Sequence, residues 1–194
     1  VGVIGTNEVF MGKSGLAWSG TAAGKFALNS SSEGNRLIFR PWHEETTIGT
    51  RGNATGDVVL QREVEFNTDD ESGAAGTIRV DGKFYYQNSA SILITGHGTF
   101  EVNSASLGGD ALVRVANGAT LKFITSDAML SKGDFTFEGG STLVLPAAGS
   151  GAVALGGNVG FAGEGTVAVK LGDGTEIADG TYELLTIGGA IDDY

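Results

Sequence analysis

Short stretches of alternating apolar and polar residues dominate the chain, whereas helical patterns are almost missing. The alternating runs are rich in Val, Ile, Phe, Tyr and Thr and are bounded by Gly, Asn, Asp or Ser, as is typical of β-strands. No window keeps the 3.6-residue apolar spacing of a helix. The sequence therefore predicts an all-β protein. We expect strands at 36–40, 57–67, 77–81, 83–87, 91–95, 99–103, 111–115, 120–125, 134–138, 142–145, 166–171 and 182–187.

Glycine recurs along the chain at steps of 20 to 22 residues. The sequence after several of these glycines also repeats: a small residue or Thr is followed by alternating apolar positions. One turn of a three-sided parallel β-helix requires such a period, with a short strand on each side and glycine at the corners. The GTVAV segment starts five residues out of register, so we expect one coil to carry an insertion. The glycine series is Gly12, Gly34, Gly56, Gly76, Gly98, Gly118, Gly140, Gly160 and Gly180.

The period favours one solenoid domain over residues 1–194, a parallel β-helix of about nine coils of 20–22 residues. Residues 56–191 are expected to form regular coils and residues 1–55 a divergent N-terminal cap. An antiparallel β-sandwich or jelly roll is the alternative, because Asn117-Gly118 is also a typical hairpin turn. In the solenoid we expect an interior stack of phenylalanines: Phe66, Phe84, Phe100, Phe123, Phe135, Phe137 and Phe161.

The amino-acid composition excludes several classes of protein and of chemistry. The 194 residues include 33 Gly, 2 Pro and no Cys, and 41% are hydrophobic, which excludes collagen, a disordered chain and disulfide or thiolate chemistry. The net charge of −11 disfavours nucleic acid as a partner. Neither a signal-peptide core nor a long apolar run is present, so we expect no membrane insertion by this segment. Because the chain opens at Val1 rather than Met, we expect a processed or excised segment.

The sequence from Gly98 to Ile191 has the pattern of a known repeat family. GATLKF at 118–123, GSTLVL at 140–145 and GTVAVKLGDGTEIADGTYELLTIGGAI at 165–191 resemble the autotransporter-associated β-strand repeats of bacterial autotransporter passengers. The N-terminal half departs from that pattern, most clearly in RPWHEE at 40–45 and DDES at 69–72. The resemblance implies a right-handed β-helix that is exported and displayed at a bacterial cell surface, as a stalk or adhesin without catalytic chemistry.

The densest group of chemically active residues is Arg40-Pro41-Trp42-His43-Glu44-Glu45. An exposed Trp42 could stack on a sugar ring while Arg40, His43, Glu44 and Glu45 bond the hydroxyls, which makes these five residues a candidate glycan site. The alternative is structural: Trp42 packs on the solenoid and the charges form its solvated rim. Neighbouring residues of a strand point to opposite faces, so Glu44 and Glu45 are poor candidates for a catalytic pair.

A second acidic segment, Asp69-Asp70-Glu71, offers carboxylate oxygens that Ca²⁺ would accept, although a solvated acidic loop is the favoured interpretation. We expect no other cofactor. His97, between two glycines, is expected to be a solvated corner residue. No nucleophile elbow, phosphate loop, zinc-protease motif or dinucleotide fingerprint is present. The basic residues of the predicted strands show no acidic cluster at matching coil positions, so a polysaccharide lyase is not favoured.

These observations predict a non-catalytic extracellular β-solenoid segment of a bacterial surface protein, working as a stalk or adhesin toward a host or matrix glycan or protein. Open ends of a solenoid expose strand edges, so end-to-end self-association is a further expectation. The alternative is a carbohydrate-binding or polysaccharide-cleaving module that uses residues 40–45. Loss of glycan binding in Trp42→Ala would separate the two.

Overall fold

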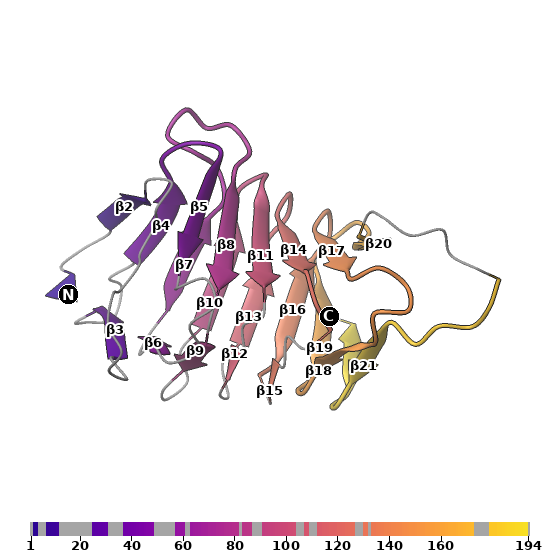
Figure 1. Cartoon of the computed structure of the whole chain (residues 1–194). Helices are drawn as coiled ribbons and strands as arrows, with labels where there is room; N and C mark the ends of the chain where they lie inside the picture. The colour runs from indigo at the N-terminus through magenta and orange to yellow at the C-terminus, as the bar shows by residue number, and fades with distance from the viewer. Residues whose placement is uncertain are drawn as a thin grey trace.

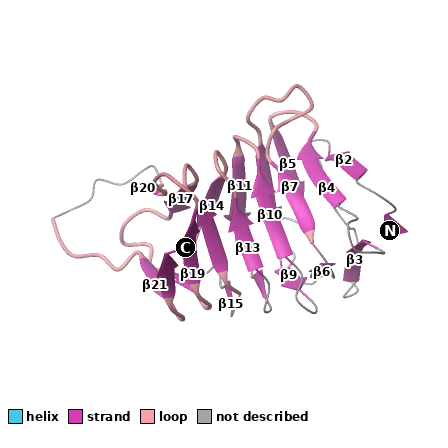
Figure 2. Cartoon of the chain, turned by 180° about the vertical axis from the view of Figure 1, so that it is seen from behind, coloured by secondary structure: helices cyan, strands magenta, loops and turns pink. Residues whose placement is uncertain are grey.

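The computed structural model is a parallel β-solenoid, which confirms the predicted fold class. The chain passes through three sheets in a fixed order, and every pairing within these sheets is parallel. Figures 1 and 2 show the strands lying side by side along a stack that runs from the N-terminus to the C-terminal coils. The structure describes residues 2–3, 7–11, 25–30, 37–48, 57–60, 63–81, 83–86, 91–103, 107–108, 112–126, 130–131, 133–172 and 179–193.

Each coil contributes successive strands to sheets I, II and III. Sheet I contains β1 (Gly2–Val3), β3 (Lys25–Ser30), β6 (Asp57–Leu60), β9 (Lys83–Tyr86), β12 (Leu107–Gly108), β15 (Leu130–Ser131), β18 (Val153–Leu155) and β21 (Leu185–Ile187). Sheet II contains β2 (Asn7–Met11), β4 (Leu37–Pro41), β7 (Val64–Asn67), β10 (Ser91–Thr95), β13 (Leu112–Val115), β16 (Phe135–Glu138), β19 (Val159–Ala162) and β22 (Ile191–Asp193). Sheet III contains β5 (Glu45–Ile48), β8 (Thr77–Asp81), β11 (Thr99–Asn103), β14 (Thr120–Phe123), β17 (Thr142–Leu145) and β20 (Ala168–Leu171).

Coil length is more variable than the glycine series indicates. The middle coils are nearly equal in length, because their equivalent positions in sheet III are evenly spaced along the chain: Thr77, Thr99, Thr120 and Thr142. The next coil is longer. Thr142 pairs with Ala168 and not with Glu164, which even spacing would place there, and this agrees with the expected insertion. At the other end of the sheet, the coil from Glu45 to its partner Thr77 is longer still.

The glycine series itself does not mark one structural position. Gly98 directly precedes Thr99, whereas Gly118 lies two residues before the equivalent Thr120. Gly118 is a corner residue with a φ of +85°, a conformation that favours glycine. Gly98 is required for space, because a Cβ there would lie 2.0 Å from the carbonyl oxygen of Gly76. Gly12, Gly34 and Gly56 are outside the described residues.

The interior is apolar, as predicted. Phe66, Phe100, Phe123, Phe135 and Phe137 are at most 2% exposed, and Phe161 packs half-buried against them. The side chain of Phe84 lies outside the described part of the chain. Ring stacking continues between coils, with centroid distances of 5.7 Å from Phe39 to Phe66 and 5.0 Å from Phe66 to Phe100. The functional groups therefore lie on the outer faces and at the corners.

One predicted strand is wrong. The run 57–67 was expected to be continuous, but it divides into β6 in sheet I and β7 in sheet II. The two strands belong to different sides of the coil, which one uninterrupted alternation cannot describe. The part of the chain that the structure describes contains no helix long and apolar enough to span a membrane.

Candidate functional site

The corner where sheet II passes into sheet III brings together residues that are far apart in the sequence. We call it the II–III corner: residues 42–44, 68–76, 96–98, 116–119, 139–141 and 163–167. The two loops nearest the N-terminal end, between β4 and β5 and between β7 and β8, rise side by side above the stack in Figures 1 and 2. The candidate glycan segment, the candidate calcium segment and His97 all lie here.

Arg40 fastens one loop to the other. Its Nε donates a hydrogen bond to the carbonyl oxygen of Asp69 at 3.1 Å, and a terminal nitrogen donates to the carbonyl oxygen of Asp70 at 2.8 Å. A weaker contact of 3.4 Å joins it to Glu8. Since two guanidinium nitrogens hold the backbone of the 68–76 loop, Arg40 acts here as a structural clamp.

Two histidines contact carboxylate groups of the same 68–76 loop. The Nδ1 of His43 lies 2.7 Å from a carboxylate oxygen of Glu71. The backbone N–H of His97 donates to Asp69 at 2.7 Å, and its ring Nδ1 lies 3.1 Å from the other oxygen of that carboxylate. His97 is a solvated corner residue, as predicted, with 77% of its side chain exposed, but it also pairs with Asp69.

Asp70 organises the loop from within. One carboxylate oxygen accepts hydrogen bonds from the Ser72 N–H at 2.8 Å, the Ser72 hydroxyl at 2.7 Å and the Ala74 N–H at 2.9 Å. The Ser72 hydroxyl bond lowers the pKa of Asp70 below its ordinary value and outweighs the opposing effect of desolvation; backbone bonds and the nearby His43 act in the same direction. Asp70 is therefore ionised at neutral pH.

The candidate calcium segment divides its carboxylates among separate partners. Asp69 faces His97, Asp70 caps its own loop and Glu71 faces His43. Among the described residues, no group of three or more His, Cys, Asp or Glu side chains is placed to hold a metal ion. Calcium binding at Asp69, Asp70 and Glu71 stays a prediction, and it would require these side chains to leave their present partners.

A hollow of about 630 Å³ opens beside this loop, lined by His43, Glu44, Glu45, Asp70 and Thr77. Glu44 and Glu45 line it together, contrary to the expectation that they face opposite ways. The reason is local: β5 begins at Glu45, and Glu44 belongs to the bend before it, where strand alternation does not apply. Both side chains are exposed.

Trp42 directly precedes His43, which lines this hollow, and it is 52% exposed. Its backbone N–H donates to the carbonyl oxygen of Met11 at 2.7 Å, which anchors the main chain. Its ring meets that of His43 edge-on, with centroids 6.2 Å apart. Because the main chain is held while half of the indole stays open to solvent, Trp42 can offer a ring face to a ligand.

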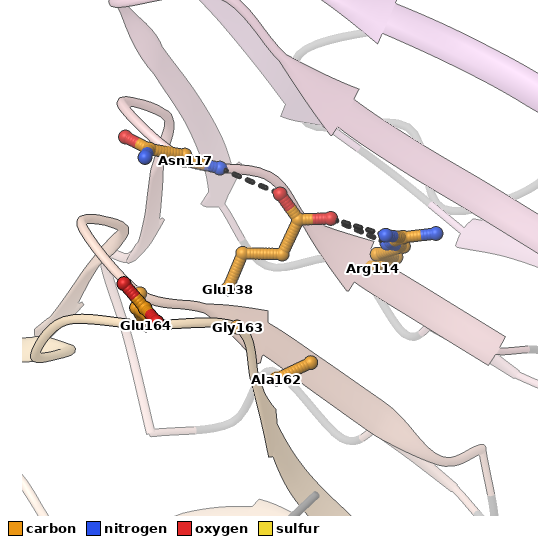
Figure 3. Close-up of a pocket in the computed structure, with 7 residues that line it drawn as sticks. Arg114, Asn117, Glu138, Ala162, Gly163 and Glu164 are labelled. Carbon is orange, nitrogen blue, oxygen red and sulfur yellow. Dashed lines mark hydrogen bonds and ion pairs between the residues drawn. The ribbon is translucent and has the colours of Figure 1, made fainter.

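A second, smaller hollow of about 320 Å³ lies farther along the corner, over three successive coils. In Figure 3, Glu138 lies between Arg114 and Asn117. It accepts hydrogen bonds from the Arg114 Nε at 2.7 Å and the Asn117 N–H at 3.1 Å. Sequence reasoning missed this group, because its side chains come from different coils. The hollow is lined by Arg114, Asn117, Glu138, Gly139, Ala162, Gly163 and Glu164.

The outer face of sheet III carries a charged row that the sequence reasoning also missed. Glu101 sits between Arg79 and Lys122 on adjacent strands, 2.5 Å from the Arg79 Nε and 3.0 Å from the Lys122 Nζ. Burial alone would lower the pKa of Arg79, but the hydrogen bond and charge of Glu101 raise it. Glu101 is a single acid between two bases, so the row is a set of ion pairs and not the acidic cluster that a polysaccharide lyase would need.

Comparisons with known proteins return no relative. No family model, no curated protein and no solved structure matches the chain. The fold and the chemistry of its outer surface are therefore the basis for any functional assignment.

Proposed function

We propose that this chain is a non-catalytic β-solenoid segment of a bacterial surface protein, working outside the cell as a stalk or adhesin. The observation that carries the proposal is the continuity of the three parallel sheets, two of them with eight strands each. A stack of coils about 4.8 Å apart is a stiff spacer, and it repeats side chains at that interval along each outer face.

The placement of charge supports the adhesive part of this proposal. The interior is filled with apolar side chains, so polar groups such as Arg114 and Glu138 face outward on successive coils. Many weak contacts to a host or matrix polymer add up when they share one rigid support.

The test is display of the chain on bacterial cells between a membrane anchor and a fluorescent reporter. A flexible Gly/Ser linker of equal length is the control, because it collapses into a coil. We expect the reporter to stand farther from the membrane on the solenoid than on the linker, and the displaying cells to adhere better to immobilised matrix material. Equal reporter heights would contradict the stalk, and equal adhesion would contradict the adhesin.

The exposure of Trp42 favours a second candidate function, carbohydrate binding at residues 40–45. A half-exposed indole whose ring contacts His43, a residue of the polar hollow, is a suitable platform for the apolar face of a sugar ring. Binding to a glycan array by the whole chain, lost in Trp42→Ala, is the expected result. Tyr182→Ala is the matched control, because Tyr182 is another exposed aromatic residue, 37% exposed, near the other end of the stack. Equal glycan binding by wild type and Trp42→Ala would contradict this candidate.

A further inference from the structure

The hollow lined by His43, Glu44, Glu45, Asp70 and Thr77 is strongly acidic. Residues 40–45 and 69–71 contain five carboxylates and one guanidinium, that of Arg40. Two of the carboxylates are engaged by histidines, Asp69 by His97 and Glu71 by His43. Arg40 is turned to the loop backbone and to Glu8. The charge that remains directed at the hollow is that of Glu44, Glu45 and Asp70.

Asp70 has the features of a binding group. The residue is only 9% exposed, yet it lines the hollow. One of its oxygens accepts three hydrogen bonds from the loop, whereas the other makes no hydrogen bond to the described part of the chain. A buried carboxylate with one oxygen committed and one open holds its position in advance, so it can receive a donor without reorganising.

The other groups around the hollow differ in what they can bind. The side chain of Glu44 makes no hydrogen bond or ion pair with the residues that the structure describes, while Glu45 interacts with the positive charge of Arg79. Thr77 contributes a hydroxyl at the first position of β8. Trp42 adds an exposed ring, whose face attracts cations as well as sugar rings. Acidic oxygens beside an indole face match a ligand that is both cationic and ring-shaped.

We propose that this hollow binds an amino sugar with a free ammonium group, as part of a polymer of glucosamine-type residues. The ammonium group lies against Glu44 and Asp70, and the sugar ring stacks on Trp42. This inference rests on the carbohydrate-binding candidate and specifies its ligand class. A neutral sugar would leave the carboxylates without a counter-charge, and an anionic sugar would be repelled.

The test is calorimetric titration of the whole chain with two oligosaccharides of equal length, a fully deacetylated glucosamine hexamer and its N-acetylated counterpart. We expect the deacetylated hexamer to bind about tenfold or more tightly than the acetylated one, with affinity falling as salt is added. Glu44→Gln and Asp70→Asn should each weaken binding by about tenfold. The Asn side chain keeps the oxygen that caps the loop, and circular dichroism verifies that the variants are folded.

Three controls make the outcomes distinct. Glu183→Gln, an exposed residue of the C-terminal coil, should bind as wild type does. Equal affinity for the two hexamers would overturn the ammonium site while leaving carbohydrate binding intact. Oligolysine binding as tightly as the deacetylated hexamer would overturn the sugar assignment and show that charge alone is recognised. Failure of both hexamers to bind would overturn this inference, and the glycan array then decides whether the site binds any other carbohydrate.

Discussion

Strands within the stack and the terminal strands at its C-terminal end use the same inward-facing positions, but the side chains differ sharply in exposure. Leu143 in β17 is 3% exposed, whereas Val169, its partner in β20, is 61% exposed. Val159 in β19 is 2% exposed, whereas its partner Ile191 in β22 is 65% exposed. No described strand lies beyond β20 in sheet III or beyond β22 in sheet II. At the C-terminal end of the stack, therefore, inward-facing apolar residues are exposed because no described strand covers them.

This contrast identifies where the stability of the molecule resides. A globular domain wraps its core on all sides, but here each coil is covered by its neighbours, so stability is a sum over interfaces between coils. The middle coils have two such interfaces each. The open face of the last coil includes unpaired strand edges and apolar side chains, which is the basis for expecting end-to-end association. That association stays a prediction.

The largest expected effect comes from removing a ring between middle coils. Phe100 is fully buried against Phe66, and Phe100→Ala should lower the free energy of unfolding by about 3–5 kcal/mol. Val169→Ala removes an inward-facing apolar group of the last coil and should cost less than about 0.5 kcal/mol. Urea unfolding followed by circular dichroism measures both. Similar losses in the two variants would show that the last coil is covered in solution.

The next largest loss of stability is expected where a substitution forces the backbones of two coils apart. A Cβ at position 98 would lie 2.0 Å from the Gly76 carbonyl oxygen, so Gly98→Ala must push two coils apart and should cost about 3 kcal/mol. Gly163→Ala is the control in the last coil: φ is +79° and no atom lies within 4 Å of the added Cβ, so only backbone strain of about 1 kcal/mol is expected. Thermal unfolding midpoints compare them, and a larger loss for Gly163→Ala would contradict the close-packing explanation.

Ion pairs between coils should contribute less to the free energy of unfolding than the buried rings and the close glycine contact. The Glu101 side chain is 5% exposed, but its partners Arg79 and Lys122 are 28% and 36% exposed, so solvent screens the row. We expect Glu101→Gln to cost about 1 kcal/mol and the cost to shrink in high salt. Glu138→Gln, whose partner Arg114 is 53% exposed, should have a smaller effect still. Urea midpoints at low and high salt test the pair; salt-independent losses would show that packing, and not charge, is responsible.

The smallest effect concerns the loop outside the stack. The pKa of Asp70 is lowered in the folded chain, so its contribution to stability is fully present above the unfolded value of about 3.9 and is lost as the pH falls through the lower folded value. Asp70→Asn removes that titration. The stability gap between wild type and variant should be constant above about pH 5 and should close below about pH 4. Melting temperatures across this range measure it, and parallel curves would contradict the assignment.

Regular coils were the easiest part of the fold to predict. The strands at 77–81, 91–95, 99–103 and 142–145 have the predicted bounds, because each is flanked by turn residues and alternates between a buried and an exposed face. The strands of sheet I were mostly missed, since β12 and β15 have two residues each and leave no alternation to detect. Glu45–Ile48 was missed because its buried Thr46 disguises the inward face.

The sequence by itself determined the architecture: short alternating strands that recur at a nearly constant spacing can bury their apolar positions only by stacking coil on coil. It also identified the residues whose side chains could take part in binding or chemistry, namely Arg40–Glu45, Asp69–Glu71 and His97. Only the tertiary structure decided that these residues lie together at one corner. The contacts from Arg40 and His97 to Asp69 join neighbouring coils, and they form because stacking returns the chain to the same corner one coil later. Which side chains meet at such a corner depends on the length of each coil. Insertions change that length, and the local sequence does not reveal it.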